Sequence, residues 1–263
     1  MVSSKGQSVM KRLDWYLLRL KERYQEYITS NFLISYQKSG RTWLRQILAN
    51  YMSEYYGYPY AKDMAKLIGP VRAARIIYSH ANHLSGGIEY SHRYQRRLNG
   101  KRVLLQVRSP VELMPDYYNQ LKKRVAIDAV DDMNFSDFIR HEKYGVSSVV
   151  EFMNFWYSSR SQFEAFYILR YEDALQDIKG VMTDMLLFFK VPIDNELLHK
   201  AIRDVENKTE HIRENGVSVS SAGKLISREE GQSGNGQEFF YVSEKDRLYL
   251  NTALSRLDTG LGY

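Results

Sequence analysis

The sequence predicts an α/β fold in which a central parallel sheet carries helices on both faces. Short apolar runs alternate along the chain with longer stretches whose apolar residues recur at helical spacing. Strands of this continuous apolar kind are buried on both sides, which requires a helical layer above and below the sheet. With 263 residues, 44% of them hydrophobic and 26% charged, the chain suits one globular domain with a sizeable core.

Each element follows from local pattern. The strands are short apolar runs, as in FLI and VLLQV, and the helices repeat apolar residues three or four positions apart. Gly57, Pro59 and Pro110 mark element ends. In chain order we expect a helix over 8–28, a strand at 32–34, helices over 42–56 and near 61–68, strands over 74–80 and 100–110, helices over 111–124, 135–141 and 147–163, a strand over 164–173, and helices over 174–189, 194–206 and 243–257.

No internal repeat or linker is evident, so we expect a single domain over 1–263, with the first helix inside 1–30. The segment 217–237 is rich in Gly and Ser and lacks an apolar period, which is typical of a lid loop. Because there are no cysteines, disulfides, thiolate metal sites and cysteine nucleophiles are excluded. No apolar run is long enough to span a membrane and no signal peptide is recognisable, so we expect a cytoplasmic protein.

The chain carries a net charge of +6 and has a pI near 9.2, which calls for an anionic partner. Basic clusters interleaved with aromatic residues would favour a nucleic-acid surface, and the 21 tyrosines make that reading tempting. The tyrosines, however, are spread over the whole chain, including the expected core. A small, multiply charged anion such as a nucleotide explains the charge equally well, and we do not expect polymeric nucleic acid as a partner.

Residues 31–48, NFLISYQKSGRTWLRQIL, are the most informative part of the chain. An apolar strand runs through the loop 37–41 into a helix, so the positive end of the helix, free backbone N–H groups and Lys38 meet at one place. This arrangement suits a phosphate or a sulfate. The pattern is P-loop-like without matching the nucleoside-triphosphatase motif, because Lys38 precedes Gly40 and no upstream glycine exists.

Polar side chains also follow the other expected strands. His80 follows the second strand, Arg108 the third, and Tyr171 with Glu172 the fourth. Ligands of parallel sheets bind at the carboxyl ends of the strands, so these side chains should converge on Lys38.

The loop resembles the 5′-phosphosulfate loop of the cytosolic-type sulfotransferases, usually written Y-P-K-S-G-T-T-W. The positions that match are Tyr36, Lys38, Ser39, Gly40, Thr42 and Trp43, whereas Gln37 and Arg41 depart from it. The resemblance implies transfer of a sulfuryl group from 3′-phosphoadenosine 5′-phosphosulfate (PAPS) to a hydroxyl or an amine. It also implies that no metal is required, since a lysine takes the place of Mg²⁺.

The resemblance assigns roles to individual residues. Lys38 would stabilise the leaving oxygen, and the segment from Ser39 through Gly40, Arg41 and Thr42 to Trp43 would hold the 5′-phosphate. His80 would be the general base, with His83 as the alternative.

The 3′-phosphate and the adenine receive residues in the same way. Arg108 in R-S-P resembles the arginine that binds the 3′-phosphate, but Asp116 stands where the family has a serine and would repel this phosphate unless Lys122 or Arg124 compensates. Tyr171 in Y-E-D would meet the adenine, or Y-E-D could simply cap the next helix. Arg228 and Gly231, the latter in a G-x-x-G with Gly234, resemble weakly the late glycine loop over the 3′-phosphate.

We therefore expect a PAPS-dependent sulfotransferase acting on a small molecule, with a homodimer left open. Asp116, Asp128, Asp131 and Asp132 hint at a cationic acceptor, such as an alkaloid or toxin metabolite modified by a bacterial tailoring enzyme. Two alternatives stay open: a nucleotide-kinase-like ATP phosphotransferase, and a non-catalytic nucleotide- or RNA-binding module.

Overall fold

The structure is a computed structural model that describes residues 17, 20–57, 75–80, 91–122, 130, 132–214 and 242–263. Its sheet consists of β1 (Asn31–Ser35), β2 (Ile76–Ser79), β3 (Arg102–Val107) and β4 (Ala165–Arg170). The strand order is β2-β1-β3-β4, and every neighbouring pair is parallel. The predicted parallel sheet is confirmed.

Alternate residues of each strand feed two separate cores, because successive side chains of a strand point to opposite faces. Phe32 and Ile34 of β1 belong to one core, and Leu33 belongs to the other. Leu104 and Leu105 of β3 divide in the same way. This explains why the strands read as continuous apolar runs: both faces are covered.

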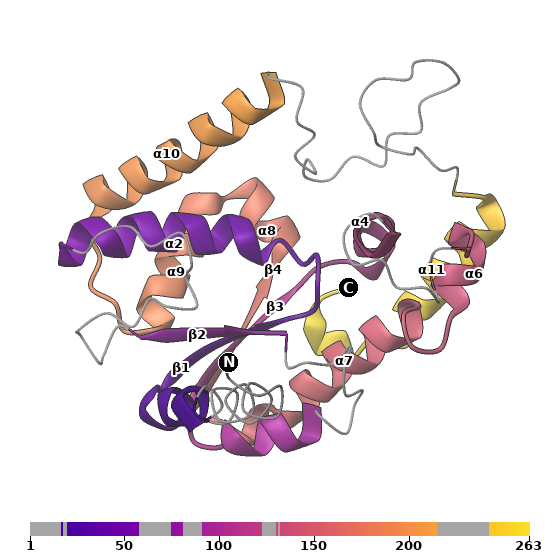
Figure 1. The fold of residues 1–263 in the computed structure, drawn as a ribbon, viewed down its shortest axis with the longest axis horizontal. Coiled ribbons are helices and arrows are strands. Elements are labelled where there is room, and N and C mark those ends of the chain that lie inside the picture. The colour runs from indigo at the N-terminus through magenta and orange to yellow at the C-terminus, as the bar shows by residue number, and fades with distance from the viewer. Residues whose placement is uncertain are drawn as a thin grey trace, which may run out of the picture.

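Helices form a layer on each face, as Figure 1 shows. One layer contains α2 (Arg41–Tyr56), α8 (Tyr171–Gln176), α9 (Ile178–Phe188) and α10 (Asn195–Glu214). The other contains α4 (Pro110–Gln120), α6 (Phe135–Arg140), α7 (Val146–Ser158) and α11 (Glu244–Leu254). Short 3₁₀ turns follow α7 at Ser159–Gln162 and α11 at Thr259–Leu261. The predicted coverage of both faces is thus confirmed.

Several predicted boundaries differ from the observed ones, and two of the differences have identifiable reasons. The helix after β1 begins at Arg41, one residue earlier than predicted, because the left-handed Gly40 is its N-cap. The predicted helix 174–189 is two helices that start at Tyr171 and Ile178. They are divided at Asp177, whose side chain accepts from the backbone N–H of Gly180 and caps α9.

Other expected features lie partly or wholly outside the described residues. Residues 20–28 of the expected N-terminal helix are helical up to Ile28, and its earlier part is described only at Leu17. The expected helix near 61–68 and the expected lid 217–237 are not among the described residues, and neither are His83, Arg228 and Gly231. Among the residues that are described, no helix is long and apolar enough to cross a membrane.

Candidate functional site

The carboxyl ends of the four strands, here called the strand exits, lie side by side in the spatial order β2, β1, β3, β4. His80 follows β2, the loop containing Lys38 follows β1, Arg108 follows β3, and Tyr171 follows β4. Three contacts join them: Arg41 to His80, Arg108 to the Lys38 carbonyl, and the Arg108 guanidinium to the Tyr171 ring. The four strand exits therefore meet at one edge of the sheet, as predicted, and the contact with Lys38 is made through its backbone carbonyl.

The loop between β1 and α2 has an unusual backbone. Lys38 adopts a φ of 65° and Gly40 a φ of 84°, both in the left-handed region. As the N-cap of α2, Gly40 has no side chain to accept from the first N–H groups, and the first turn of the helix contains no acidic residue. The partial positive charge at this helix end is therefore left for a ligand.

Two carbonyls of the β1–α2 loop accept hydrogen bonds from side chains at the end of β3. Gln106, only 1% exposed, donates from Nε2 to the Ser39 carbonyl over 2.6 Å, and Arg108 donates from Nη1 to the Lys38 carbonyl over 3.0 Å. In a planar trans peptide the N–H points away from the C=O. The N–H groups of Ser39 and Gly40 are consequently directed to the opposite side of the loop, as in an anion-binding nest.

Sequence reasoning missed Gln106. The signal was available, because Gln106 is the polar residue in the otherwise apolar run VLLQV. A buried amide within a strand needs a partner, and here that partner is the loop of the neighbouring strand β1.

Several polar atoms beside the loop are buried without a hydrogen-bond partner. They include Ser39 Oγ, Arg41 Nη1 and Arg108 Nε. A buried donor left unsatisfied costs on the order of 1–3 kcal/mol, and native proteins retain few of them. These three atoms lie at or beside the N-terminus of α2, where a ligand rich in oxygen acceptors would satisfy them.

The protonation state of His80 follows from its two neighbours. Nδ1 lies 2.9 Å from the Ser35 carbonyl, which can only accept, so Nδ1 carries the proton. Nε2 lies 2.6 Å from Nη2 of Arg41, which can only donate, so Nε2 holds the lone pair. Burial, together with the positive charge of Arg41, lowers the pKa of His80 to about 4. The imidazole is therefore neutral near pH 7 and presents its basic nitrogen to Arg41.

Arg41 lies among like charges and aromatic rings. Burial and the neighbouring Arg45 lower the pKa of Arg41 to about 10, although it stays charged near neutrality. The Arg45 guanidinium lies 5.1 Å from the centre of the Tyr78 ring. Burial raises the pKa of Tyr78, so this phenol is neutral and offers no countercharge.

Asp116 forms an ion pair with Arg108, with 2.7 Å between Oδ2 and Nη1. From the sequence, compensation for this carboxylate was expected from Lys122 or Arg124. Lys122 instead lies over the Tyr118 ring, and Arg124 is outside the described residues. Asp116 is eight residues after Arg108, so the helix α4 brings it back over the strand exit. The carboxylate occupies one side of the guanidinium that was expected to bind a phosphate.

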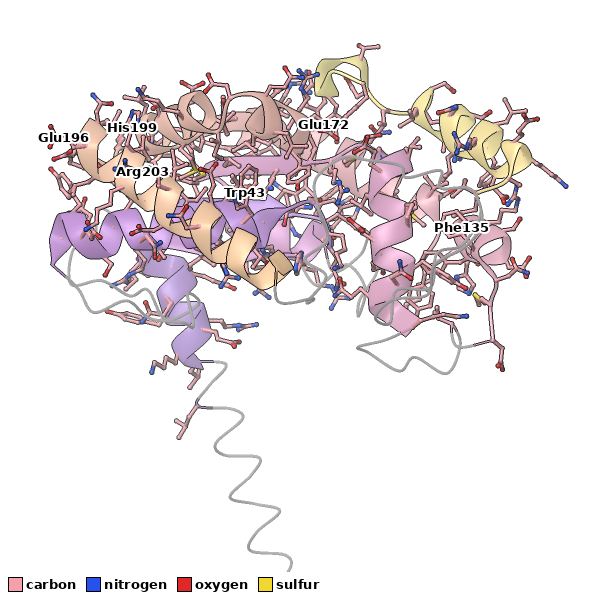
Figure 2. The ribbon with its side chains drawn as sticks, turned by 90° about the horizontal axis from the view of Figure 1, so that it is seen from above. Trp43, Phe135, Glu172, Glu196, His199 and Arg203 are labelled. Carbon is pink, nitrogen blue, oxygen red and sulfur yellow. The ribbon has the colours of Figure 1, made fainter. Side chains whose placement is uncertain are left out.

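Tyr171 packs directly on the loop. A Cβ at position 40 would lie 2.2 Å from the Tyr171 ring, so only glycine fits there, quite apart from its positive φ. The ring of Trp43, labelled in Figure 2, meets Tyr171 edge-on with 6.1 Å between centroids. Arg108 lies over the same ring at 4.9 Å. Tyr171 is 7% exposed and supports the loop from the side of α8.

The other two residues of Y-E-D hold the fold together at this edge. Glu172, labelled in Figure 2, accepts from the Ser109 N–H over 2.7 Å and from the Tyr263 hydroxyl over 2.8 Å. Asp173 pairs with Arg170 through both carboxylate oxygens. Glu172 and Asp173 lie in the first turn of α8, where carboxylates are favoured. Neither carboxylate caps the helix with a hydrogen bond, because the N-cap is Arg170 and both carboxylates have other partners.

Tyr36, the first matched residue of the loop, faces the core. Its hydroxyl is 3.0 Å from Ser148 Oγ of α7, and its ring meets Tyr117 and Phe152 edge-on. Burial raises the pKa of Tyr36 to about 12. This tyrosine anchors the start of the loop and leaves the anion site to the residues after it.

No group of three or more His, Cys, Asp or Glu side chains within the described residues could hold a metal ion. A hollow of about 510 Å³ opens elsewhere, between α7 and the C-terminal segment, lined by Glu151, Asn154, Phe155, Ser158, Arg256, Leu257 and Asp258. None of these residues belongs to a strand exit, so we assign the hollow no part in the chemistry.

The comparisons with known proteins agree with this geometry. The model of a family described as "Sulfotransferase domain" matches residues 29–235, which is most of the chain. The chain belongs to the sulfotransferase domain family. Its predicted enzyme class, that of the PAPS-dependent sulfotransferases, is thereby confirmed.

A solved structure, mouse sulfotransferase SULT7A1 complexed with PAP, is similar to the chain with a TM-score of 0.52. The two sequences are 14% identical. The match covers 87% of the present chain and 84% of the mouse protein. At this identity the likeness shows the fold. No curated protein matches the chain.

Proposed function

We propose that this sulfotransferase moves a sulfuryl group from PAPS to a hydroxyl or an amine of a small molecule, and that the β1–α2 loop holds the phosphosulfate. The observation that carries the proposal is the set of unsatisfied buried donors at the start of α2. They surround a helix end without an acidic residue. A doubly charged phosphosulfate supplies both the negative charge and the oxygens that these groups lack.

The expected chemistry is an in-line displacement. The acceptor oxygen or nitrogen forms a bond to sulfur while the bond from sulfur to the bridging oxygen breaks, and the electron pair leaves with the 5′-phosphate. Lys38 stabilises the charge on that oxygen, and the acceptor proton passes to Nε2 of His80, the nitrogen that holds the lone pair. The product nucleotide is 3′-phosphoadenosine 5′-phosphate (PAP).

The acceptor is proposed only as a class. Of the four aspartates that suggested a cationic acceptor, Asp116 is paired with Arg108 and Asp132 is exposed. Asp128 and Asp131 lie outside the described residues. The described part of the chain thus adds no support for a cationic acceptor, and a cytoplasmic location stays part of the proposal.

The test is turnover of PAPS with a panel of phenols, alcohols, neutral amines and cationic alkaloids. We expect PAP release together with an acceptor whose mass has increased by one sulfuryl group. ATP with Mg²⁺ and a short RNA serve as competing ligands for the two alternative functions. Phosphorylated acceptor from ATP, or binding of RNA without any binding of PAP, would contradict the proposal.

Gln106 provides a test of the loop geometry. Gln106→Leu removes the donor that holds the Ser39 carbonyl and is expected to weaken PAP binding about tenfold, which corresponds to roughly 1.4 kcal/mol. The measurement is calorimetric titration with PAP. Gln95→Leu is the matched control, because Gln95 is also buried and hydrogen-bonded but bonds to Asn99 and Gln162. Equal losses in both variants would show a general packing effect.

Arg108 and Asp116 test the 3′-phosphate assignment. Arg108→Ala is expected to abolish the preference for PAP over adenosine 5′-phosphate, because the guanidinium is the donor proposed for the 3′-phosphate. Asp116→Asn is expected to strengthen PAP binding about tenfold, because it removes a carboxylate held 2.7 Å from Nη1 of Arg108. Both are measured by titration with the two nucleotides. If Asp116→Asn weakens PAP binding, Asp116 orients Arg108 and does not oppose the phosphate.

A further inference from the structure

The candidate base is covered at the atom that has to accept a proton. Nε2 of His80 carries the lone pair, and Nη2 of Arg41 donates to it over 2.6 Å. While this hydrogen bond exists, no acceptor hydroxyl can donate to the same lone pair. Arg41 is also one of the two loop positions at which the chain departs from the sulfotransferase pattern described above, so the cover is a property of this chain.

Arg41 is poorly satisfied where it lies. Its Nη1 is buried without a hydrogen-bond partner. Its helix turn contains no acidic residue, and Arg45 adds a like charge one turn further along α2. Among the described residues no carboxylate forms an ion pair with it. A partly buried cation with these surroundings gains from an anion.

The nearest place for such an anion is the loop itself. Arg41 is the first residue of α2, directly after Gly40, and its backbone belongs to the helix end proposed to hold the phosphosulfate. The exchange of the neutral imidazole for a phosphate or sulfate oxygen at this helix end requires a rotation of the Arg41 side chain. A guanidinium prefers the anion, because hydrogen bonds between charged partners are about twice as strong as neutral ones.

We propose that Arg41 is a positioning residue that blocks the basic nitrogen of His80 in the free enzyme and uncovers it when the phosphosulfate of the donor draws the guanidinium away. The proposal rests on the proposed function. Base and donor are then coupled: the acceptor loses its proton to His80 only after the sulfuryl group is in place. Arg41 meanwhile becomes a second cation beside Lys38 at the transferring group.

Among the described residues, the groups that face His80 come from three places. Arg41 and Arg45 belong to α2, Tyr78 lies in β2 before His80, and the backbone groups belong to Ser35, the last residue of β1, and to Tyr36 after it. Within the part of the chain that the structure describes, only the Arg41 contact is a hydrogen bond from a side chain to the ring, so it is the contact that a ligand can exchange.

The test is an NMR titration of the His80 ring nitrogens, assigned by the signal lost in His80→Gln. In the wild-type apoenzyme we expect neutral His80 with its proton on Nδ1 and a low pKa. In Arg41→Gln the pKa of His80 should rise by about one unit or more. Arg45→Gln is the matched control, since it removes a neighbouring positive charge but no hydrogen bond to the ring, and its effect should be smaller.

Addition of PAP then tests the release. Its charge raises the pKa of His80 in every variant, but the rise should be larger in the wild type than in Arg41→Gln by about one unit, because only the wild type also loses the arginine contact. Equal rises in both proteins, or an apo pKa unchanged by Arg41→Gln, would overturn the proposal. If Arg41→Gln does not fold, Arg41→Met removes both the charge and the donors while it keeps a side chain of similar length, and the same comparison applies. Failure of PAP to bind at all would refute the proposed donor site and the release step together, while the apo comparison still decides whether Arg41 restrains His80.

Discussion

Lys38→Ala is expected to lower kcat by about two to four orders of magnitude, the range found when one donor at a developing charge is removed. The lysine lies in the loop between β1 and α2 and its carbonyl accepts from Arg108, so its side chain starts beside the first N–H groups of α2. Charge on the bridging oxygen appears only as the bond to sulfur breaks. The loss should therefore fall on kcat, and the affinity for PAPS should change much less.

The matched control is Lys190→Ala. Lys190 is the other non-glycine residue with a positive φ among the described residues, at 57° against 65° for Lys38, and it is exposed at the end of α9. The two variants therefore place alanine in the same strained backbone conformation, and only one of them loses the side chain proposed to be catalytic. Turnover that is unchanged in Lys38→Ala, or equally reduced in both variants, would refute the role of Lys38.

His80→Ala is expected to abolish transfer to a hydroxyl acceptor while PAP binding survives, because the base acts on the acceptor and the donor does not need it. Its pH dependence gives a second check. The base works only in its neutral form, so kcat/KM for the donor should fall as the pH drops through the free-enzyme pKa of about 4 and stay level from pH 5 to 8. An unperturbed histidine would lose activity below about pH 6.5.

His83→Ala is the comparison for this experiment, since His83 is the alternative base. It should cost far less activity than His80→Ala. The measurements are kcat with a phenol or alcohol acceptor and the affinity for PAP by titration. If His83→Ala abolishes transfer and His80→Ala does not, the base is His83, and the neutral imidazole at the β2 exit has a structural role.

The sequence by itself determined the parallel sheet and the polar residues at its carboxyl edge. A strand whose residues are nearly all apolar, such as VLLQV, has to be covered on both faces. This property depends only on consecutive residues, so the sequence is enough to predict it. The convergence of Lys38, His80, Arg108 and Tyr171 follows because parallel strands end at one edge. The family could be recognised because the residues of its characteristic loop are contiguous in the chain.

Only the tertiary structure decided how these residues are paired. Arg41 and His80 are 39 positions apart, and Gln106 lies 67 positions from the Ser39 carbonyl that it holds. Neither pairing can be predicted from a periodic pattern in the sequence. The distance between the partners depends on the order of the strands in the sheet and on the conformation of the loop. Asp116 and Arg108 are only eight positions apart, yet the turn of α4 was needed to show that the carboxylate meets this arginine and not Lys122. Hydrogen bonds and ion pairs act over a few ångströms, so the direction of each side chain, which the packed fold alone fixes, determines which partner it finds.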